Sequence, residues 1–232
     1  MDDLGRLAVP VPVARSPIAQ LAPEEVLAGW AVSVRRSTAD LTLADLSPLA
    51  KILVKAPAGV QLGDLMSVPL GRAERRAAGT DGWEAAALVT HSAPFDWLVL
   101  SGTAAGEGLL RRLAGAAETC PELVTVVDLT HGRALVRLSG ERAREVLSKE
   151  CGLDLSDSVL PDGAAVRTAV AGVAADLVRD DVRGIEGSAR LSYLLHCERA
   201  SGQYLFDALL DAGDEFRLEV DGFGEGTSGW FG

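Results

Sequence analysis

Cysteine is scarce in this 232-residue chain, which contains only Cys120, Cys151 and Cys197. The count is odd, and the spacing contains no CxxC pair or other metal-like pattern. A disulfide framework is therefore excluded, and we expect buried free thiols in a reducing compartment.

Long apolar runs are also missing, since no stretch approaches the roughly 20 apolar residues that a membrane helix needs. Met1 is followed by Asp2 and Asp3, without the basic and apolar regions of a secretory signal. The sequence therefore predicts a soluble protein that stays in the cytoplasm.

Positive charge is in deficit, with 22 Lys and Arg residues against 33 Asp and Glu residues and a formal net charge of −11. Such a chain repels the phosphates of nucleic acid, so nucleic-acid binding is excluded as a main function. The same charge would keep a subunit soluble until it meets its partner.

Motifs that carry chemistry are absent as well. His91, His131 and His196 form no helical i,i+4 pair that could gather a zinc ion. The glycines of the tail DGFGEGTSGWFG lack the flanking strand and helix of a phosphate-binding loop. No nucleophile elbow, paired-acid signature or cysteine with a plausible base is found. We predict no catalytic, cofactor-binding or metal-ligating residue in this chain.

An internal repeat is the main feature that the sequence does contain. LTLADLSPLAKILVKAPAGVQLGDL, from Leu41 to Leu65, recurs in LVTVVDLTHGRALVRLSGERAREVLSKE, from Leu123 to Glu150, after a shift of 83 positions that carries Leu41 onto Val124. The shift pairs Asp45 with Asp128, and a hydroxyl residue follows each acid two positions later. Such residues set turns through bonds to local backbone N–H groups, so a structural role outweighs a catalytic one.

A second match follows in the same order. WLVLSGTAAGEGLLRRL, from Trp97, aligns without a gap on YLLHCERASGQYLFDAL, from Tyr193, at a shift of 96 positions. The shift pairs Gly106 with Gly202, and in both copies an apolar strand leads into a helix. The two matches indicate a duplicated unit, and chance alignment of apolar-rich sequence remains the alternative.

Local patterns predict strands and helices in each half. β-rich runs predict strands at 124–129, 133–138 and 190–197, and a hairpin at 165–179 broken by Gly172. Helical spacing predicts helices at 201–212, with Tyr204 on the apolar face, and at 141–150, capped by Ser139, packed through Ala143, Val146 and Leu147, and carrying a Glu145–Lys149 pair. We also expect a short helix from Pro23 to Trp30, a weak helix at 56–65 and a polar loop at 72–82.

These elements predict an α+β fold of two pseudo-symmetric halves, in which helices lie on antiparallel sheet. The predicted division is an extended N-terminal arm (1–22), a first half (23–122), a second half (123–216) and a flexible C-terminal tail (217–232).

Both ends of the chain carry apolar residues suited to docking. Prolines at 10, 12 and 17 favour an extended arm, which presents Val9, Val11, Val13 and Ile18. Trp230 and Phe231 end the glycine-rich tail. We predict that these six residues bind a partner. The alternative is that both ends pack on the chain's own surface.

Several blocks resemble the gamma subunit of heterotetrameric sarcosine oxidase, within the folate-binding aminomethyltransferase superfamily. They are VVDLTHGRALVRLSGERAREVLSKECGLDL, RTAVAGVAADLVR and YLLHCERASGQYLFDALLDAGDEF, with RSPIA, ADLSPLAKILVKAP and SAPFDWLVLS in the first half. The resemblance covers roughly residues 15–215 and implies the duplicated folate-binding aminomethyltransferase-like fold.

The resemblance also implies partners. It describes a small subunit without a cofactor of its own, packed against larger flavin-containing alpha and beta subunits and a small zinc-binding delta subunit. The complex would oxidise an N-methyl amine and pass the one-carbon unit to tetrahydrofolate. FAD, FMN, NAD, tetrahydrofolate and zinc would belong to the partner subunits.

Departures from the catalytic relatives favour a scaffold role. The Gly-Gly and Asp-Asp motif of aminomethyltransferases is not visible in GRAERRAAGTDGWEAAALVTH. The Lys-Gly-Cys-Tyr-x-Gly-Gln motif of the iron-sulfur-repair relatives is absent as well. Aminomethyltransferases continue into a further barrel, and we expect none beyond Gly232. The alternatives are a stand-alone folate-dependent aminomethyl transferase with a divergent site and a binding module without an enzyme partner.

Overall fold

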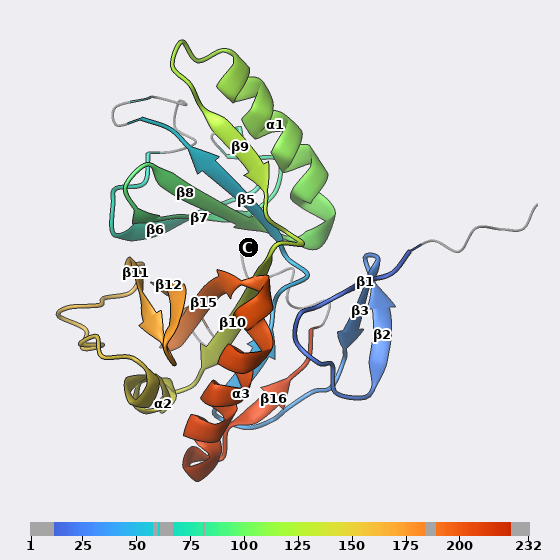
Figure 1. The fold of residues 1–232 in the computed structure, drawn as a ribbon, viewed down its shortest axis with the longest axis vertical. Coiled ribbons are helices and arrows are strands. Elements are labelled where there is room, and N and C mark those ends of the chain that lie inside the picture. Colours follow the sequence, from blue (N-terminus) through green and yellow to red (C-terminus); the bar gives the residue numbers. More distant parts are fainter. Residues whose placement is uncertain (1–11, 58–59, 61–66, 81, 184–188, 224–232) are drawn as a thin grey trace, which may run out of the picture.

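The computed structural model describes residues 12–57, 60, 67–80, 82–183 and 189–223 (Figure 1). Its helices are α1 (Gly106–Glu118), α2 (Ala143–Glu150) and α3 (Gly202–Gly213), with 3-10 turns at Thr103–Ala105, Arg199–Ser201 and Asp214–Phe216. Its strands are β1 (Ala14–Arg15), β2 (Glu24–Leu27), β3 (Trp30–Ser33), β4 (Thr42–Asp45), β5 (Ala50–Lys55), β6 (Arg72–Arg76), β7 (Ala87–Ala93), β8 (Asp96–Ser101), β9 (Thr125–Asp128), β10 (Arg133–Ser139), β11 (Ala165–Val170), β12 (Val173–Arg179), β13 (Val182–Arg183), β14 (Ala189–Arg190), β15 (Ser192–Glu198) and β16 (Glu219–Asp221). None of the described helices is long and apolar enough to cross a membrane.

Two sheets with matching strand order form the body of the molecule. The first sheet has the order β6-β7-β8-β5-β9, and the second has the order β11-β12-β15-β10-β4-β16. β4 comes from the first repeat but lies in the second sheet, whereas β9 comes from the second repeat and lies in the first sheet. Smaller sheets, β1-β3-β2 and β13-β14, complete the described strands. The predicted α+β fold with duplicated halves is confirmed, and the halves exchange one strand.

The exchanged strands make equivalent backbone bonds. The Leu46 N–H donates to the carbonyl of Leu135 at 2.8 Å, and the Leu129 N–H donates to the carbonyl of Lys51 at 2.8 Å. Leu46 and Leu129 are related by the shift of 83 positions, but Lys51 and Leu135 are related by 84. One residue is therefore added in the turn of the second copy.

The two repeat acids set the turns, as predicted. The Asp45 carboxylate accepts a bond from the Ser47 N–H at 2.9 Å, and the Asp128 carboxylate accepts one from the Thr130 N–H at 2.8 Å. The hydroxyls then cross between halves, since Ser47 accepts from the Leu135 N–H and Thr130 from the Lys51 N–H. The structural interpretation of both acids is confirmed.

Two matched glycines let a helix approach its strand. A Cβ on Gly106 would lie 2.9 Å from the Cβ of Ala50, and one on Gly202 would lie 2.6 Å from the Cβ of Ala134. Neither glycine has a positive φ, so close packing explains the residue type. The pairing of Gly106 with Gly202 in the sequence thus has a steric cause.

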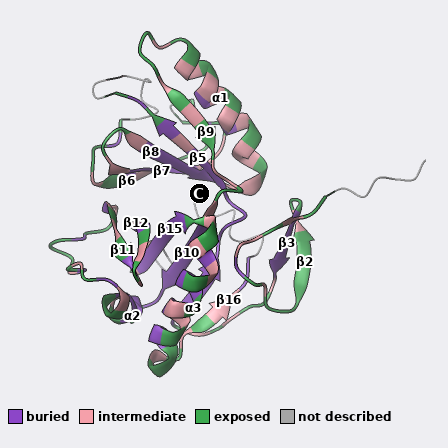
Figure 2. Cartoon of the chain, in the orientation of Figure 1, coloured by how far each residue is buried: buried purple, intermediate pink, exposed green. Residues whose placement is uncertain are grey.

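The sheets pack face to face, with helices on their outer faces. α1 covers the first sheet, and α2 and α3 cover the second (Figure 1). An apolar cluster that includes Leu88, Leu100, Leu135 and Leu194 fills the centre of the layer between the sheets. Figure 2 shows the buried residues concentrated along the central strands.

The helix faces follow the predicted spacing with one exception. Ala143, Val146 and Leu147 of α2 are fully buried, which confirms the predicted face. On α3, Tyr204 is 60% exposed, and Phe206 packs inward instead. The predicted Glu145–Lys149 pair is wrong, because Glu145 pairs with Arg142 and Lys149 pairs with Glu215.

Three local predictions are wrong because tertiary pairing overrides local preference. The helix expected from Pro23 is β2, which turns at Ala28 and Gly29, both with positive φ, and pairs with β3. Part of the loop expected at 72–82 is β6, paired with β7. Ser139 ends β10 and bonds to Ser192, so it does not cap α2. The weak helix expected at 56–65 falls mostly outside the described residues.

Candidate functional site

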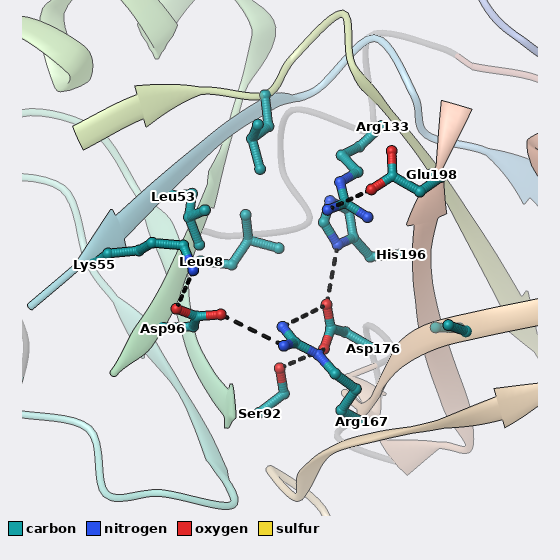
Figure 3. A pocket seen from close by; sticks show the side chains of 13 residues that line it. Leu53, Lys55, Ser92, Asp96, Leu98, Arg133, Arg167, Asp176, His196 and Glu198 are labelled. Carbon is teal, nitrogen blue, oxygen red and sulfur yellow. Dashed lines mark hydrogen bonds and ion pairs between the residues drawn. The ribbon is translucent and has the colours of Figure 1, made fainter. Parts of the chain in front are cut away.

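A cavity of about 340 Å³ lies at one end of the layer between the two sheets. Both sheets supply its walls, so the packing of the halves creates it. Leu53, Leu98 and Leu129 form an apolar wall, and the rest is largely charged (Figure 3). The polar side chains are Lys55, Ser92, Asp96, Arg133, Arg167, Asp176, His196 and Glu198.

A continuous chain of charges forms one side of the cavity. Lys55 Nζ lies 2.9 Å from Asp96 Oδ1, and Arg167 Nη1 lies 3.4 Å from Asp96 Oδ2. Arg167 also donates from Nε to Asp176 at 2.8 Å. Because Asp96 is on the first sheet and Arg167 on the second, this chain ties the sheets together, as Figure 3 shows.

Asp176 lies at the centre of this network. Burial alone would raise the pKa of its carboxyl, but bonds from His196, Arg167 and Ser92 outweigh that effect and hold it well below its usual range. The Ser92 hydroxyl donates to Oδ1 at 2.7 Å. Asp176 is therefore an anion at neutral pH, and it is a poor general base because its charge is already stabilised.

His196 is almost fully buried next to Asp176. Burial lowers its pKa, and the neighbouring carboxylate only partly offsets this, so the ring is neutral at pH 7. Its Nδ1 lies 3.4 Å from Asp176 Oδ2. Because an ionised carboxylate only accepts, Nδ1 carries the proton. Nε2 is then an acceptor, and it has no hydrogen-bond partner in the structure.

The rim of the cavity carries a separate ion pair. Arg133 Nη2 lies 2.8 Å from Glu198 Oε1, with side chains 28% and 65% exposed. With His196 neutral, the lining holds three cations and three carboxylates, so its formal charge is zero. The arrangement suits ligand binding, and the imidazole of His196, which Asp176 orients, is the one neutral nitrogen base among the described residues of this lining.

Neither a metal nor a pterin fits this site well. Within the described part of the chain, no group of three or more His, Cys, Asp or Glu side chains could hold a metal ion. Among the described residues, His196 is the one aromatic ring that lines the cavity, and the cavity volume is near the low end for small-molecule pockets. The lining therefore does not fit tetrahydrofolate, and we derive no step through it.

A buried lysine lies in the same inter-sheet layer. Lys51 is fully buried on β5, and its Nζ donates to the carbonyls of Ser47 at 2.6 Å and Leu49 at 2.8 Å. Burial lowers its pKa to about 7, although Asp45 and Asp128 act in the opposite direction. No sequence motif distinguishes this lysine from a surface lysine.

The cavity residues were missed although the repeat contained a signal. Pairing Tyr193 with Trp97 also places His196 on Leu100, so a polar residue replaces an apolar one at a strand position. In the structure Asp176 pairs with His196 in the register in which Leu88 pairs with Leu100. A comparison of the two copies for such exchanges would have identified the Asp176–His196 pair.

The predicted partner-binding residues are placed only in part. Val13 is 45% exposed and remains a candidate. Ile18 is a correction, because it is 2% exposed and packs in the buried cluster that includes Leu205 and Leu209 of α3. Val9, Val11, Trp230 and Phe231 lie outside the described residues.

Comparisons with known proteins place this geometry in context. The family described as the GCVT N-terminal domain matches residues 24–226. A search of curated proteins gives no match.

Two solved structures share the fold. Heterotetrameric sarcosine oxidase from Corynebacterium sp. U-96, in complex with pyrrole 2-carboxylate, matches with a TM-score of 0.62 and 22% identity, over 78% of this chain and 88% of that chain. Glycine cleavage system aminomethyltransferase T from Bartonella henselae matches with a TM-score of 0.66 and 18% identity, over 86% of this chain and 55% of that chain.

Proposed function

The chain belongs to the GCVT N-terminal domain family, and from this premise we propose that it is a small, non-catalytic subunit of an amine-oxidising complex similar to heterotetrameric sarcosine oxidase. The complex would oxidise an N-methyl amine and pass the one-carbon unit to tetrahydrofolate. This chain would act as the gamma-type subunit between larger flavin-containing chains.

The extent of the structural match carries the proposal. The chain spans 88% of the sarcosine oxidase chain but only 55% of the aminomethyltransferase, although the TM-scores are close. At these identities the matches establish the fold alone. The chain spans about half the length of the aminomethyltransferase, and the likeness to a chain of a heterotetrameric sarcosine oxidase supports a subunit role.

The chemistry of the inter-sheet cavity agrees with a non-catalytic role. Its carboxylates already pair with Lys55, Arg133 and Arg167. An acid held in this way is stabilised as an anion and has little tendency to take a substrate proton. As the resemblance to sarcosine oxidase implies, FAD, FMN, NAD, tetrahydrofolate and zinc would be held by the partner subunits.

The alternative is a stand-alone folate-dependent aminomethyl transferase. The match to aminomethyltransferase T, which covers 86% of this chain, is the observation that keeps it open. It requires tetrahydrofolate binding and transfer activity by the isolated chain.

Purification of the tagged chain from its native host tests the proposal. We expect larger chains with flavin absorbance to co-elute with it in size-exclusion chromatography, and the complex to consume oxygen when an N-methyl amine is added. The isolated chain should be colourless and inactive. Micromolar binding of tetrahydrofolate to the isolated chain, measured by calorimetry, would favour the transferase.

Matched variants locate the interface. Val13→Glu should weaken co-elution, whereas Val159→Glu, at a valine that is 53% exposed, should not. Replacing Trp230 and Phe231 together with Ala tests the tail. All variants should melt like the wild-type chain, because these residues are proposed to pack on partners. If every variant assembles normally, the interface lies elsewhere on the folded halves.

A further inference from the structure

The cavity has a counterpart at the other end of the inter-sheet layer, and the strand registers relate the two ends. Val54 pairs with Trp97 as Leu138 pairs with Tyr193. By these registers Leu53 on β5 matches Arg137 on β10. Arg75 pairs with Leu88, and Arg167 pairs with Asp176. Because Leu88 and Asp176 occupy matching positions, Arg75 and Arg167 do so as well.

Arg137 closes the counterpart end. Its side chain is fully buried, and it donates from Nη2 to Asp180 Oδ2 at 2.6 Å and from Nη1 to Ser192 Oγ at 2.9 Å. Arg75 reaches the same carboxylate from the other sheet at 2.7 Å. At the matching position, a buried guanidinium therefore fills the space between the two sheets.

Leucine leaves the other end open. The side chain of Leu53 is shorter than that of Arg137, and the cavity of about 340 Å³ begins beside it. Asp96, at the position that matches Ser192, and Asp176 face this space, and each carboxylate offers several acceptor sites. The Nε2 of His196 is buried behind the cavity wall, without a hydrogen-bond partner among the described residues.

Burying the Asp176–His196 pair lowers the free energy of unfolding, a cost that a structural role alone does not explain. At the matching positions Leu88 and Leu100 are buried and pack in the central apolar cluster. Burying Asp176 and His196 instead requires desolvation of a charge and leaves one ring nitrogen unpaired. A ligand that bonds to Asp176 would explain why the second half departs from the leucine pair.

We propose that the cavity binds a small organic cation, a guanidinium or ammonium group on a short aliphatic stem, in the place that the Arg137 side chain takes at the matching end. Leu53, Leu98 and Leu129 would contact the stem, while Asp96 and Asp176 accept its N–H groups. Lys55, whose side chain is 53% exposed, can turn outward to make room. The proposal concerns the chain itself and does not depend on the proposed complex.

The charges around the cavity favour a cation over an anion. At the closed end two arginines share the single carboxylate of Asp180. At the open end two carboxylates, Asp96 and Asp176, serve Lys55 and Arg167. Apart from Arg137 itself, the closed end has one carboxylate for one cation, Arg75, and the open end has the same ratio without a ligand, so it can accept a cation as the closed end does.

Nuclear magnetic resonance of the full chain with ethylguanidinium, a mimic of the arginine head, tests the proposal. The chain has three histidines, so His196→Leu assigns the ring signals of His196. We expect ethylguanidinium to shift these signals in a saturable way, with those of His91 and His131 unmoved. Acetate, the control of opposite charge, should cause no such shift.

Three variants complete the test. Leu53→Arg copies the closed end and should weaken ethylguanidinium binding about tenfold or more. Leu70→Arg, at a leucine that is 55% exposed, makes the same charge change elsewhere and should bind normally. The double variant Asp176→Leu with His196→Leu should lose binding in calorimetry while melting at a higher temperature. No saturable shift in the wild-type chain, equal shifts from acetate, or full binding by Leu53→Arg would overturn the proposal.

Discussion

The first sheet carries Lys51 where the second carries Leu135, and Leu53 where the second carries Arg137. Around these positions the two halves agree in strand order, in their turn-setting acids and in the glycine under each helix. The difference teaches that the backbone of the duplication is retained by turns and close contacts. The inward-facing layer has diverged, and each sheet now buries one long cation of its own.

Removing the anion at the closed end should have the largest effect on this comparison. Asp180→Ala would leave Arg137 buried without its carboxylate, and breaking a buried pair in this way typically costs about 3–5 kcal/mol of unfolding free energy. Urea denaturation measures the loss. The control Glu107→Ala breaks the exposed pair with Arg111 and should cost about 0.5 kcal/mol or less. A loss below about 1 kcal/mol for Asp180→Ala would mean that Arg137 finds other partners.

Lys51 should make stability depend on pH. Its pKa falls from 10.5 to about 7 on folding, so between these values the unfolded chain holds a proton that the folded chain has released. Stability therefore rises with pH across this window, and Lys51 adds no pH dependence below it. The contribution between pH 7 and pH 10 is about 4 kcal/mol.

Lys51→Met isolates this term, because every other titrating group is shared with the wild type. Denaturant unfolding at a series of pH values should show the two proteins diverging from alkaline to neutral pH. Equal pH dependence in both would contradict a lowered pKa. Leu135→Met, at the matching position, is the control and should follow the wild-type curve.

The matched glycines should respond unequally to alanine. A Cβ on Gly202 would meet Ala134 at 2.6 Å and Pro17 at 3.2 Å, whereas one on Gly106 would meet only Ala50, at 2.9 Å. Overpacking of this kind typically costs about 1–3 kcal/mol, so Gly202→Ala should fall at the upper end and Gly106→Ala at the lower. Thermal unfolding measures the two losses. A larger loss for Gly106→Ala than for Gly202→Ala would mean that α1 is held more rigidly than α3.

Much of the fold could be predicted because the sequence contains two copies of the same structural unit. The repeat identified the turn acids and the glycine pair, and helical spacing identified the face of α2 that buries Val146 and Leu147. The gapless alignment placed Lys51 on Ala134, however, and only the backbone bonds show that Leu135 is its counterpart. A one-residue shift turns a strand side chain to the opposite face, so the lysine could not be recognised as inward-facing.

The cavity was harder to predict because its residues come from several strands. Asp96 and Arg167 meet only when the sheets pack, and no local pattern encodes that approach. The hairpin at Ala28 and Gly29 was missed for a related reason, since Pro23 and the following acids also suit a helix start. Pairing with β3, which buries Trp30, decides between the two.

The rim pair of the cavity should have the smallest effect and would sharpen the contrast with the closed end. Arg133 and Glu198 lie 2.8 Å apart, as close as a buried pair, but their side chains are 28% and 65% exposed. Water and salt screen such a pair, so a double-mutant cycle with Arg133→Ala and Glu198→Ala should give a coupling energy of about 0.2–1 kcal/mol. The coupling should shrink further at high ionic strength. A value comparable to that of Arg137 and Asp180 would show that burial is not what separates the two ends.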